Sequence, residues 1–462
     1  MSFYQQGPQL GNQYLDDDLL RSCLARRMPK EPLRQVEPDL ERFGKRVLRD
    51  IQEWGDQAEQ SPPRLQRYDA WGRRVDLLQV CEGWRRLDAV SAEEGLVAIG
   101  YERAQGPFSR LYQLAKLYLF NPSSSTYMCP LAMTDGAARL LEVHGQAPIK
   151  QRAIKHLTSR DPREFWTSGQ WMTERRGGSD VGRSETVARA LGEGKYALYG
   201  DKWFTSATTS QMAMTLARLE DAQGDVVQGS RGLSVFYLET RKGDGSYNGI
   251  QVNRLKDKLG TNGLPTAELT LHGTEAVLVG QPGAGVKTIS TLFNVTRVYN
   301  AFAATSTLRR GFALASDYAR RREAFGHKLV ELPLHAETLA DLYVSLAASL
   351  ELSCEAALLQ GRVETGAAEP GDDALLRLLT PLAKLFTAKA SVWGCSEAVE
   401  AFGGAGYVEN TGVARLLRDA QVLSIWEGTT NVLSLDALRA LQREDAFAPF
   451  LERLRKGLEA LD

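Results

Sequence analysis

The chain has 462 residues, of which 43% are hydrophobic and 24% are charged. This length exceeds what one hydrophobic core supports, so we expect two or three domains. The formal net charge is −1, so no overall basic excess points to a nucleic-acid partner. Five scattered cysteines without a CxxC pair indicate reduced thiols and no zinc site, and the histidines lack metal-binding spacing.

The N-terminal stretch lacks the basic and apolar regions of a signal peptide and carries three consecutive acids at 16–18. No run of about eighteen apolar residues occurs, so no membrane span is expected. These features predict a cytoplasmic protein. A mature form in the mitochondrial matrix, with its leader removed, is the alternative.

Residues 1–160 are predicted to form an N-terminal α-helical domain. Apolar residues from Leu40 to Trp54 recur at spacings of three and four, and helical patterns return at 77–90 and 109–119. The segment 128–141 is apolar and rich in small residues, which predicts a buried helix.

Residues 161–284 are predicted to form a middle β domain. Apolar residues alternate with other residues in several short runs, and glycine-containing turns separate these runs. Most connections are too short for helical crossovers, so we expect antiparallel pairing.

Residues 285–462 return to the helical period and predict a C-terminal bundle of four helices. The first runs from Ile289 to about residue 325, and the second covers 339–358, before a loop at 361–373. The third is expected to bend at Pro381 and to end at Gly403-Gly404, and the fourth follows Asn431. The fold class is therefore α+β and multidomain.

The most informative stretch is 400–431, and within it IWEGTTN at 425–431. Glu427 stands beside an indole and an apolar residue, surroundings that raise the pKa of a carboxyl and suit a general base. The alternative is a helix boundary, with Thr430 or Asn431 as the N-cap of the following helix.

Three further segments carry polar groups of the kind that bind cofactors. WMTERRGGSDV at 171–181 can form a loop whose N–H groups and hydroxyls face a flat ring or phosphate, or an ordinary basic hairpin. GDKWFTS at 200–206 is rich in aromatic and hydroxyl side chains that could contact a cofactor, or it forms an ordinary strand edge. YARRREAFG at 318–326 offers a pyrophosphate clamp, or a solvated basic helix end. No GxGxxG or Walker A sequence supports Rossmann-type binding, and no GxSxG elbow supports serine catalysis.

Together these segments, with KLGTNGLPTAEL, GGAGY and RDA, resemble the acyl-CoA dehydrogenase family over essentially the whole chain. FYQQGPQLGNQYL, PPRLQRYDAWGRRVD and CPLAMT resemble its AidB-like branch. The resemblance implies N-terminal helices, a middle antiparallel β-barrel and a C-terminal four-helix bundle that together bind FAD. By resemblance, the FAD-binding positions are Met172, Thr173, Gly178, Ser179, Phe204, Ser206, Arg322, Phe325, Glu400, Gly403, Gly404, Thr429 and Asn431.

The resemblance also assigns chemical roles. Glu427 matches the catalytic base that takes the thioester α-proton while a hydride passes from the β-carbon to flavin N5. Ser179 and Arg297 match positions near the acyl-CoA. Arg322 and Phe325 match residues that reach the FAD of a neighbouring subunit, which implies a homo-oligomer, commonly a dimer of dimers. An electron-transfer flavoprotein is the expected acceptor.

Several departures from the family pattern keep alternatives open. Arg175 and Arg176 replace a common Pro-Gly, Glu400 stands where many members have Gln, and the chain ends thirty-five residues after Glu427. Bacterial AidB proteins continue further, and that extension contributes their proposed DNA-binding surface, so we expect acyl-CoA chemistry in preference to DNA binding. The alternatives are an AidB-like flavoprotein with vestigial activity and a protective or binding role, or oxidation of another acidic carbon such as that of a nitroalkane.

Overall fold

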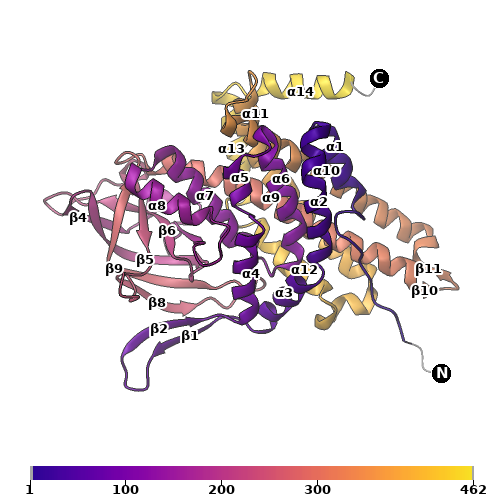
Figure 1. Cartoon of the computed structure of the whole chain (residues 1–462), viewed down its shortest axis with the longest axis horizontal. Helices are drawn as coiled ribbons and strands as arrows, with labels where there is room; N and C mark the ends of the chain where they lie inside the picture. Colours follow the sequence, from indigo (N-terminus) through magenta and orange to yellow (C-terminus); the bar gives the residue numbers. More distant parts are fainter. Residues whose placement is uncertain (1–3, 460–462) are drawn as a thin grey trace. The chain divides into compact units, whose positions relative to one another are not determined.

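The structure is a computed structural model that describes residues 4–459 (Figure 1). The chain divides into two compact units that do not follow its order. One unit, here the helical unit, holds residues up to Glu53, Glu102–Ser123 and the residues from Arg297 onward. The other, the sheet unit, holds Trp54–Tyr101 and Ser124–Thr296. The segment expected as one N-terminal helical domain therefore contributes to both units.

The sheet unit is built on seven strands. They are β3 (Ser168–Trp171), β4 (Val187–Gly192), β5 (Lys195–Ser206), β6 (Met212–Leu219), β7 (Leu233–Glu239), β8 (Ile250–Leu255) and β9 (Thr266–Val279). The strand order is β3-β6-β4-β5-β9-β7, with β8 paired to β9 and β7 also paired to β6. Because β7 returns to β6, the pairings close on themselves, as expected of a barrel.

The expectation of antiparallel pairing throughout is wrong at two places. Strand β6 runs parallel to β3, where Ser168 is opposite Met212, and parallel to β4, where Val187 is opposite Arg218. The argument from short connections applies only to strands that follow each other in the chain. These parallel partners are separated by other strands, so the chain has room to reverse twice between them.

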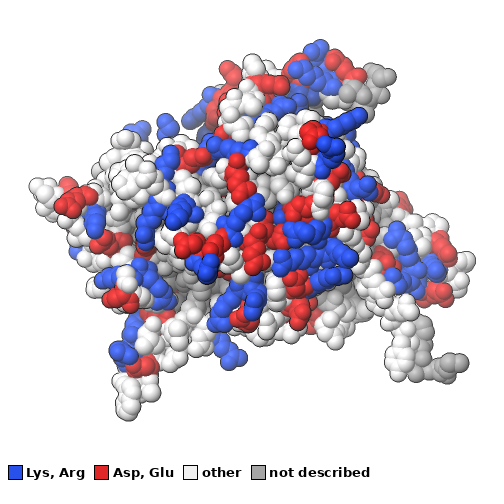
Figure 2. Space-filling model, in the orientation of Figure 1, with Lys and Arg blue, Asp and Glu red and all other residues white. Residues whose placement is uncertain are grey.

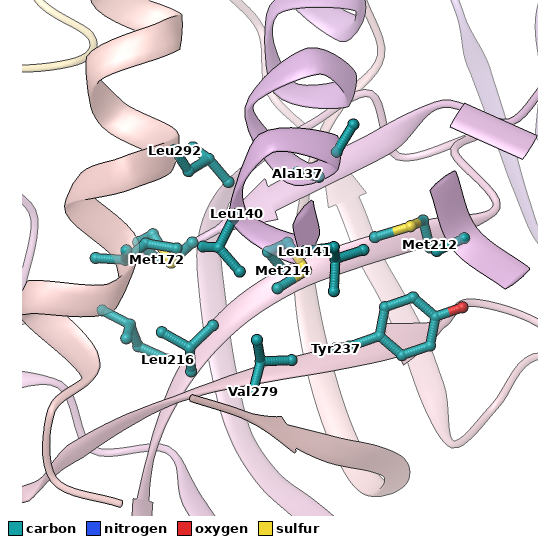
Figure 3. Packing of buried hydrophobic residues seen from close by; sticks show 14 of the residues in the cluster. Ala137, Leu140, Leu141, Met172, Met212, Met214, Leu216, Tyr237, Val279 and Leu292 are labelled. Atoms are coloured by element: carbon teal, nitrogen blue, oxygen red, sulfur yellow. The ribbon is translucent and has the colours of Figure 1, made fainter. Parts of the chain in front are cut away.

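Helices α7 (Met128–His144) and α8 (Ala147–Leu157) cover one face of this sheet (Figure 1). Figure 3 shows Leu140 and Leu141 of α7 directed at Met214 and Met212 of β6, with Leu292 of α9 (Gly285–Arg321) in the same cluster. Burial of these side chains is the main favourable term holding helix to sheet. The prediction of a buried helix at 128–141 is confirmed.

A hairpin in the sheet unit was not anticipated. Strands β1 (Arg64–Tyr68) and β2 (Arg74–Gln79) pair around the turn at 69–73, so the helix expected from residue 77 begins only with α4 (Glu82–Glu93). The buried Asp76 carboxylate accepts the Arg74 Nε–H at 2.8 Å and the Val252 N–H at 2.9 Å. This tertiary contact stabilises a strand that the local pattern does not signal.

The helical unit contains most of the long helices. The first segments are α1 (Asp18–Arg27), α2 (Lys30–Arg46), the start of α3 (Asp50–Gln60), the end of α5 (Ala98–Glu102) and α6 (Ser109–Phe120). The later ones are most of α9, then α10 (Pro333–Thr365), α11 (Asp372–Ala401), α12 (Val413–Leu423), α13 (Thr430–Arg443) and α14 (Phe447–Glu459), with a small hairpin of β10 (Glu323–Ala324) and β11 (His327–Lys328). The predicted loop at 361–373 is shorter than expected because α10 continues to Thr365, where Gly366 ends it in a left-handed conformation.

Among residues 4–459, only helix α10 is long and apolar enough to cross a membrane, judged by length and composition alone. Of its most apolar window, 56% is buried within the protein, as expected for a core helix of a bundle. Figure 2 shows acidic and basic side chains interspersed over the face displayed.

Candidate active site

The predicted base lies in a sharp turn between α12 and α13, which we call the acid turn (residues 426–429). Glu427 has φ +57° and Gly428 has φ +111°, so two successive residues adopt left-handed conformations. Only glycine adopts such angles without steric cost, and a non-glycine residue holds them when its surroundings over-determine them. Thr429 occupies the N-cap position of α13, one residue earlier than the alternative interpretation expected.

The indole of Trp426 anchors the first residue of the acid turn. Its Nε1–H donates to the side-chain oxygen of Asn300, a residue of α9 that is only 4% exposed. The Asn300 amide group also donates to the Leu423 carbonyl at 3.1 Å, at the end of α12. One buried amide therefore joins α9 to both the helix before the turn and the turn itself.

Two cations, the partly buried Arg297 and the buried Lys384, bind the next two carbonyls of the acid turn. The Arg297 Nε–H donates to the Glu427 carbonyl at 3.1 Å, and the Lys384 ammonium donates to the Gly428 carbonyl at 2.5 Å. Lys384 belongs to α11 and is 0% exposed. Charge-assisted hydrogen bonds of this kind are stronger than neutral ones, so they fix the backbone around Glu427.

Asp436 of α13 neutralises the charge of Arg297. Its carboxylate accepts from Arg297 at 2.7 Å and from Arg377 of α11 at 2.6 Å. Burial by itself raises the pKa of this carboxyl, but the Arg377 and Arg297 guanidiniums together hold it below its ordinary value. Arg297, predicted to lie near the thioester, thus contacts the acid turn and Asp436.

A second group of predicted residues lies where α9 and α11 end. The Tyr318 ring stacks on the Phe402 ring with centroids 4.3 Å apart, which brings the two helix ends together. Arg322 follows α9 and donates to the Gln5 side chain at 3.2 Å, and Phe325, in the turn between β10 and β11, is 93% exposed. The three remaining residues of this group are exposed: Glu400, Gly403 and Gly404.

In the sheet unit, the predicted FAD-binding segment forms what we call the glycine loop (residues 173–180). Its Glu174 is 5% exposed and accepts from the Lys202 ammonium at 2.7 Å, the Thr186 hydroxyl at 2.6 Å and the Glu185 N–H at 2.5 Å. Although burial raises the pKa of Glu174, the Lys202 ammonium lowers it below its ordinary value. The base of the loop is thus a fully buried ion pair.

The two predicted FAD segments of the sheet unit meet. The Trp203 N–H donates to the Thr173 carbonyl at 2.9 Å, and the Phe204 side chain next to it is 51% exposed. The Ser206 and Thr266 hydroxyls are 3.1 Å apart. Met172 is buried in the cluster under α7, whereas Gly178 and Ser179 are exposed.

A pocket of about 680 Å³ opens in the sheet unit beside the glycine loop. Ser179 lines it, together with the guanidinium-bearing residues Arg176, Arg183 and Arg218. Arg218 is 2% exposed and donates to four backbone carbonyls, those of Ser184, Gly182, Val227 and Gly229. Asp180 and Glu185 also line the pocket, and Glu185 pairs with Arg176 at 3.1 Å, so the lining carries both signs of charge, with the exposed Arg183 as the candidate partner of an anionic group.

Within the sheet unit, the residues present fit the ring of a flavin: the Phe204 ring is exposed, and the nearby Thr173, Ser179 and Ser206 carry hydroxyls. Within the helical unit, Gly403 and Gly404 have no neighbouring atom within 4 Å of an added Cβ, which leaves room for a ligand there. Among residues 4–459, no group of three or more His, Cys, Asp or Glu side chains could hold a metal ion.

Sequence reasoning missed Lys384, Asp436 and the Glu174–Lys202 pair. Lys384 interrupts an apolar helical pattern in LLTPLAKLF, and a lone charge inside an apolar stripe is the signal that could have found it. Asp436 follows the VLSL run in the same manner. The sequence order gives no indication that either residue meets the acid turn.

Three domain models match the chain. Residues 6–162 match the N-terminal domain of the adaptive response protein AidB. Residues 169–274 match the acyl-CoA dehydrogenase middle domain, and residues 283–442 match the acyl-CoA dehydrogenase C-terminal domain.

Full-length relatives agree with these matches. Acyl-CoA dehydrogenase family member 11 of Caenorhabditis elegans is 47% identical, covering 99% of this chain and 75% of the relative. The putative acyl-CoA dehydrogenase AidB of Escherichia coli is 32% identical, covering 85% of this chain and 71% of AidB. The crystal structure of Caenorhabditis elegans ACDH-11 in complex with C11-CoA superposes with a TM-score of 0.96 at 46% identity, covering 98% of this chain and 78% of that one.

Proposed function

Because this chain belongs to the acyl-CoA dehydrogenase family, we propose that it is an FAD-dependent dehydrogenase in which Glu427 removes the α-proton of an acyl-CoA thioester. The family comprises oxidoreductases that act on the CH–CH bond of acyl-CoA. The observation that carries the proposal is the left-handed Glu427, in a turn held by Trp426 and by the cations of Arg297 and Lys384. Strain of this kind at a carboxylate is typical of a site that needs one exact side-chain position.

The chain's own residues divide the work. Glu427 accepts the α-proton, and the electron pair left behind forms the C=C bond as a hydride leaves the β-carbon. When bound, FAD supplies the acceptor for that hydride. Thr173, Ser179, Phe204 and Ser206 would hold the flavin ring and its chain, and the residues around Arg322 and Glu400 would hold FAD as the family resemblance implies.

Two observations support acyl-CoA as the substrate class. The ACDH-11 relative was crystallised with C11-CoA, and the pocket beside Ser179 holds the exposed Arg183, a candidate partner for a phosphate of such a ligand.

The test is anaerobic addition of acyl-CoAs of increasing chain length to the FAD-loaded protein, followed by flavin absorbance. We expect bleaching by at least one chain length. Glu427→Gln should keep FAD bound and slow bleaching by at least about 100-fold, the range of a general base. Glu409→Gln, an exposed acid paired with Arg418, is the matched control and should bleach as the wild type does. Failure of every chain length to bleach the wild type would overturn the proposal.

We also propose a homo-oligomer, built as a dimer of dimers, with an electron-transfer flavoprotein as acceptor. Phe325 at 93% exposure and Tyr407 at 86% are large apolar side chains of the kind that a second subunit covers. Light scattering of the purified protein tests this; a mass of one chain at all concentrations would contradict it.

The second candidate is an AidB-like flavoprotein with vestigial activity and a protective or binding role. The match of residues 6–162 to the AidB N-terminal domain favours it. A DNA titration at low salt discriminates the DNA-binding form of this role, because phosphate contacts are strongest there. Absence of binding at low salt removes it.

A further inference from the structure

Lys384 is a buried charge that the proposed reaction does not yet use. It lies in the middle of α11 and is 0% exposed. Its ammonium is 2.5 Å from the Gly428 carbonyl. Burying an ammonium costs free energy unless its surroundings compensate, so a lysine at this position requires an explanation.

The surroundings of Lys384 point to the acid turn. The Glu427 and Gly428 carbonyls are adjacent in the chain, and each accepts from a different cation, Arg297 for the first and Lys384 for the second. The Asp436 carboxylate, which also accepts from Arg377, holds Arg297 in place. Both cations thus donate hydrogen bonds to the backbone carbonyls of the two left-handed residues.

The electrostatics couple Lys384 to the base. Burial lowers the pKa of the Lys384 ammonium to about 7, while the Glu427 carboxylate raises it and the charges of Arg297 and Lys389 lower it. The Glu427 carboxylate is thus close enough to stabilise the charged form of Lys384.

We propose that Lys384 is a positioning residue for Glu427, which it serves by fixing the left-handed acid turn through the Gly428 carbonyl and by supplying a buried positive charge. This inference rests on the proposed role of Glu427 as the base. Lys384 itself contacts the backbone of the turn, and the proton goes to the Glu427 carboxylate.

The experiment separates proton removal from flavin reduction. The FAD-loaded protein is mixed in D₂O with a CoA thioester whose β-carbon is replaced by sulfur, so that α-hydrogens can exchange while hydride transfer cannot occur. Mass spectrometry measures deuterium incorporation at the α-carbon, and the flavin spectrum measures the dissociation constant. Lys384→Met is similar in size and uncharged. We expect it to slow exchange by about 100-fold, the effect of a misplaced reacting group, with the dissociation constant nearly unchanged.

A second variant distinguishes positioning from general damage to the fold. Lys384→Ala leaves a space that ethylammonium can enter, so added ethylammonium should restore exchange at least in part, whereas ethanol should not. Lys389→Met removes an exposed positive charge from the same helix and should leave exchange within about twofold, since surface charges contribute little. In parallel, hydrogen exchange of residues 424–433 should be faster in Lys384→Met than in the wild type.

The outcomes are distinct. If Lys384→Met exchanges its substrate's α-hydrogens as fast as the wild type does, the role of Lys384 is overturned and the proposed function stands. Absence of exchange and of bleaching in the wild type with every acyl-CoA would overturn the proposed function, and the role of Lys384 with it. If ethanol restores exchange in Lys384→Ala as well as ethylammonium does, the positive charge of Lys384 is not needed, and that part of the proposal is overturned.

Discussion

The glycine loop and the acid turn both depend on a fully buried lysine, but they use it differently. In the glycine loop, Lys202 is paired with a buried carboxylate, Glu174, which also accepts the Thr186 hydroxyl and a backbone N–H. In the acid turn, Lys384 binds a neutral carbonyl, and the backbone adopts left-handed angles.

The difference shows two ways of shaping a site. The Glu174–Lys202 pair neutralises itself and holds a loop of ordinary backbone conformation, so its contribution is to stability. The Lys384–Gly428 contact fixes a turn in which two successive residues are left-handed, so its contribution extends to the position of the Glu427 side chain. Variants that remove one partner at a time distinguish the two arrangements.

The largest effect is expected for Glu174→Gln. Lys202 would be left as a buried charge without a counter-ion, which costs roughly 3–5 kcal/mol of unfolding free energy. Thermal unfolding with denaturant series measures this loss. The double variant Glu174→Gln/Lys202→Met removes both charges and should recover much of it; failure to recover would show that the hydroxyl and N–H contacts matter more than the pair.

The same pair predicts a pH dependence. The folded pKa of Glu174 lies below its unfolded value, so its contribution is complete above an unfolded pKa of about 4.3 and is lost as pH falls through the folded pKa. The stability difference between wild type and Glu174→Gln should therefore be constant from pH 6 to 8 and shrink in acid. A difference that grows in acid would contradict the assigned direction.

A smaller effect is expected for Asp436→Asn. Arg297 and Arg377 would lose their shared carboxylate, which costs about 2 kcal/mol for buried hydrogen bonds to charged groups. Differential scanning calorimetry checks this, with the exposed Asp373→Asn at the start of α11 as control. Equal midpoints for the two variants would argue against a structural role for the arginine pair.

The smallest effects on the free energy of unfolding are expected for alanine substitutions at two glycines. Gly428→Ala must hold φ +111° and bring a Cβ within 3.2 Å of a Leu433 methyl, so we expect a loss of roughly 1–2 kcal/mol. Gly178→Ala in the glycine loop meets only a Thr173 methyl at 3.9 Å, so the apo-protein should lose less than about 0.5 kcal/mol. Equal losses would mean that the acid turn can adopt another backbone conformation.

The elements that could be predicted from the sequence are those with a local signal. The helices at 109–119 and 128–141 follow from an apolar period that needs no partner, and the period of two marks the strands. The hairpin at Arg64–Gln79 depends on Asp76 meeting the Val252 N–H, a contact between distant segments that no local pattern encodes. The parallel pairings of β6 depend in the same way on closure of the sheet.

The residues of the candidate site also differ in whether a local sequence signal marks them. Glu427 and the glycine loop could be named because their motifs are short and contiguous. Lys384, Asp436 and Lys202 could not, because each acts through a backbone atom or carboxylate that lies far away in the chain. A buried cation is visible in a sequence only as an interruption of an apolar pattern, and its partner appears only once the helices have packed.

The discontinuous layout of the two units also dictates an order of events on the ribosome. All segments of the sheet unit have emerged once Thr296 is available, so this unit can complete its core early in synthesis. The early helices α2 and α6 of the helical unit contact each other, as in the Phe43–Phe120 ring pair, but α1 and α6 also pack on α10, which is made only after Arg297. The surface that α1 and α6 present to α10 therefore stays uncovered until late in translation, which makes it a natural binding target of a nascent-chain chaperone.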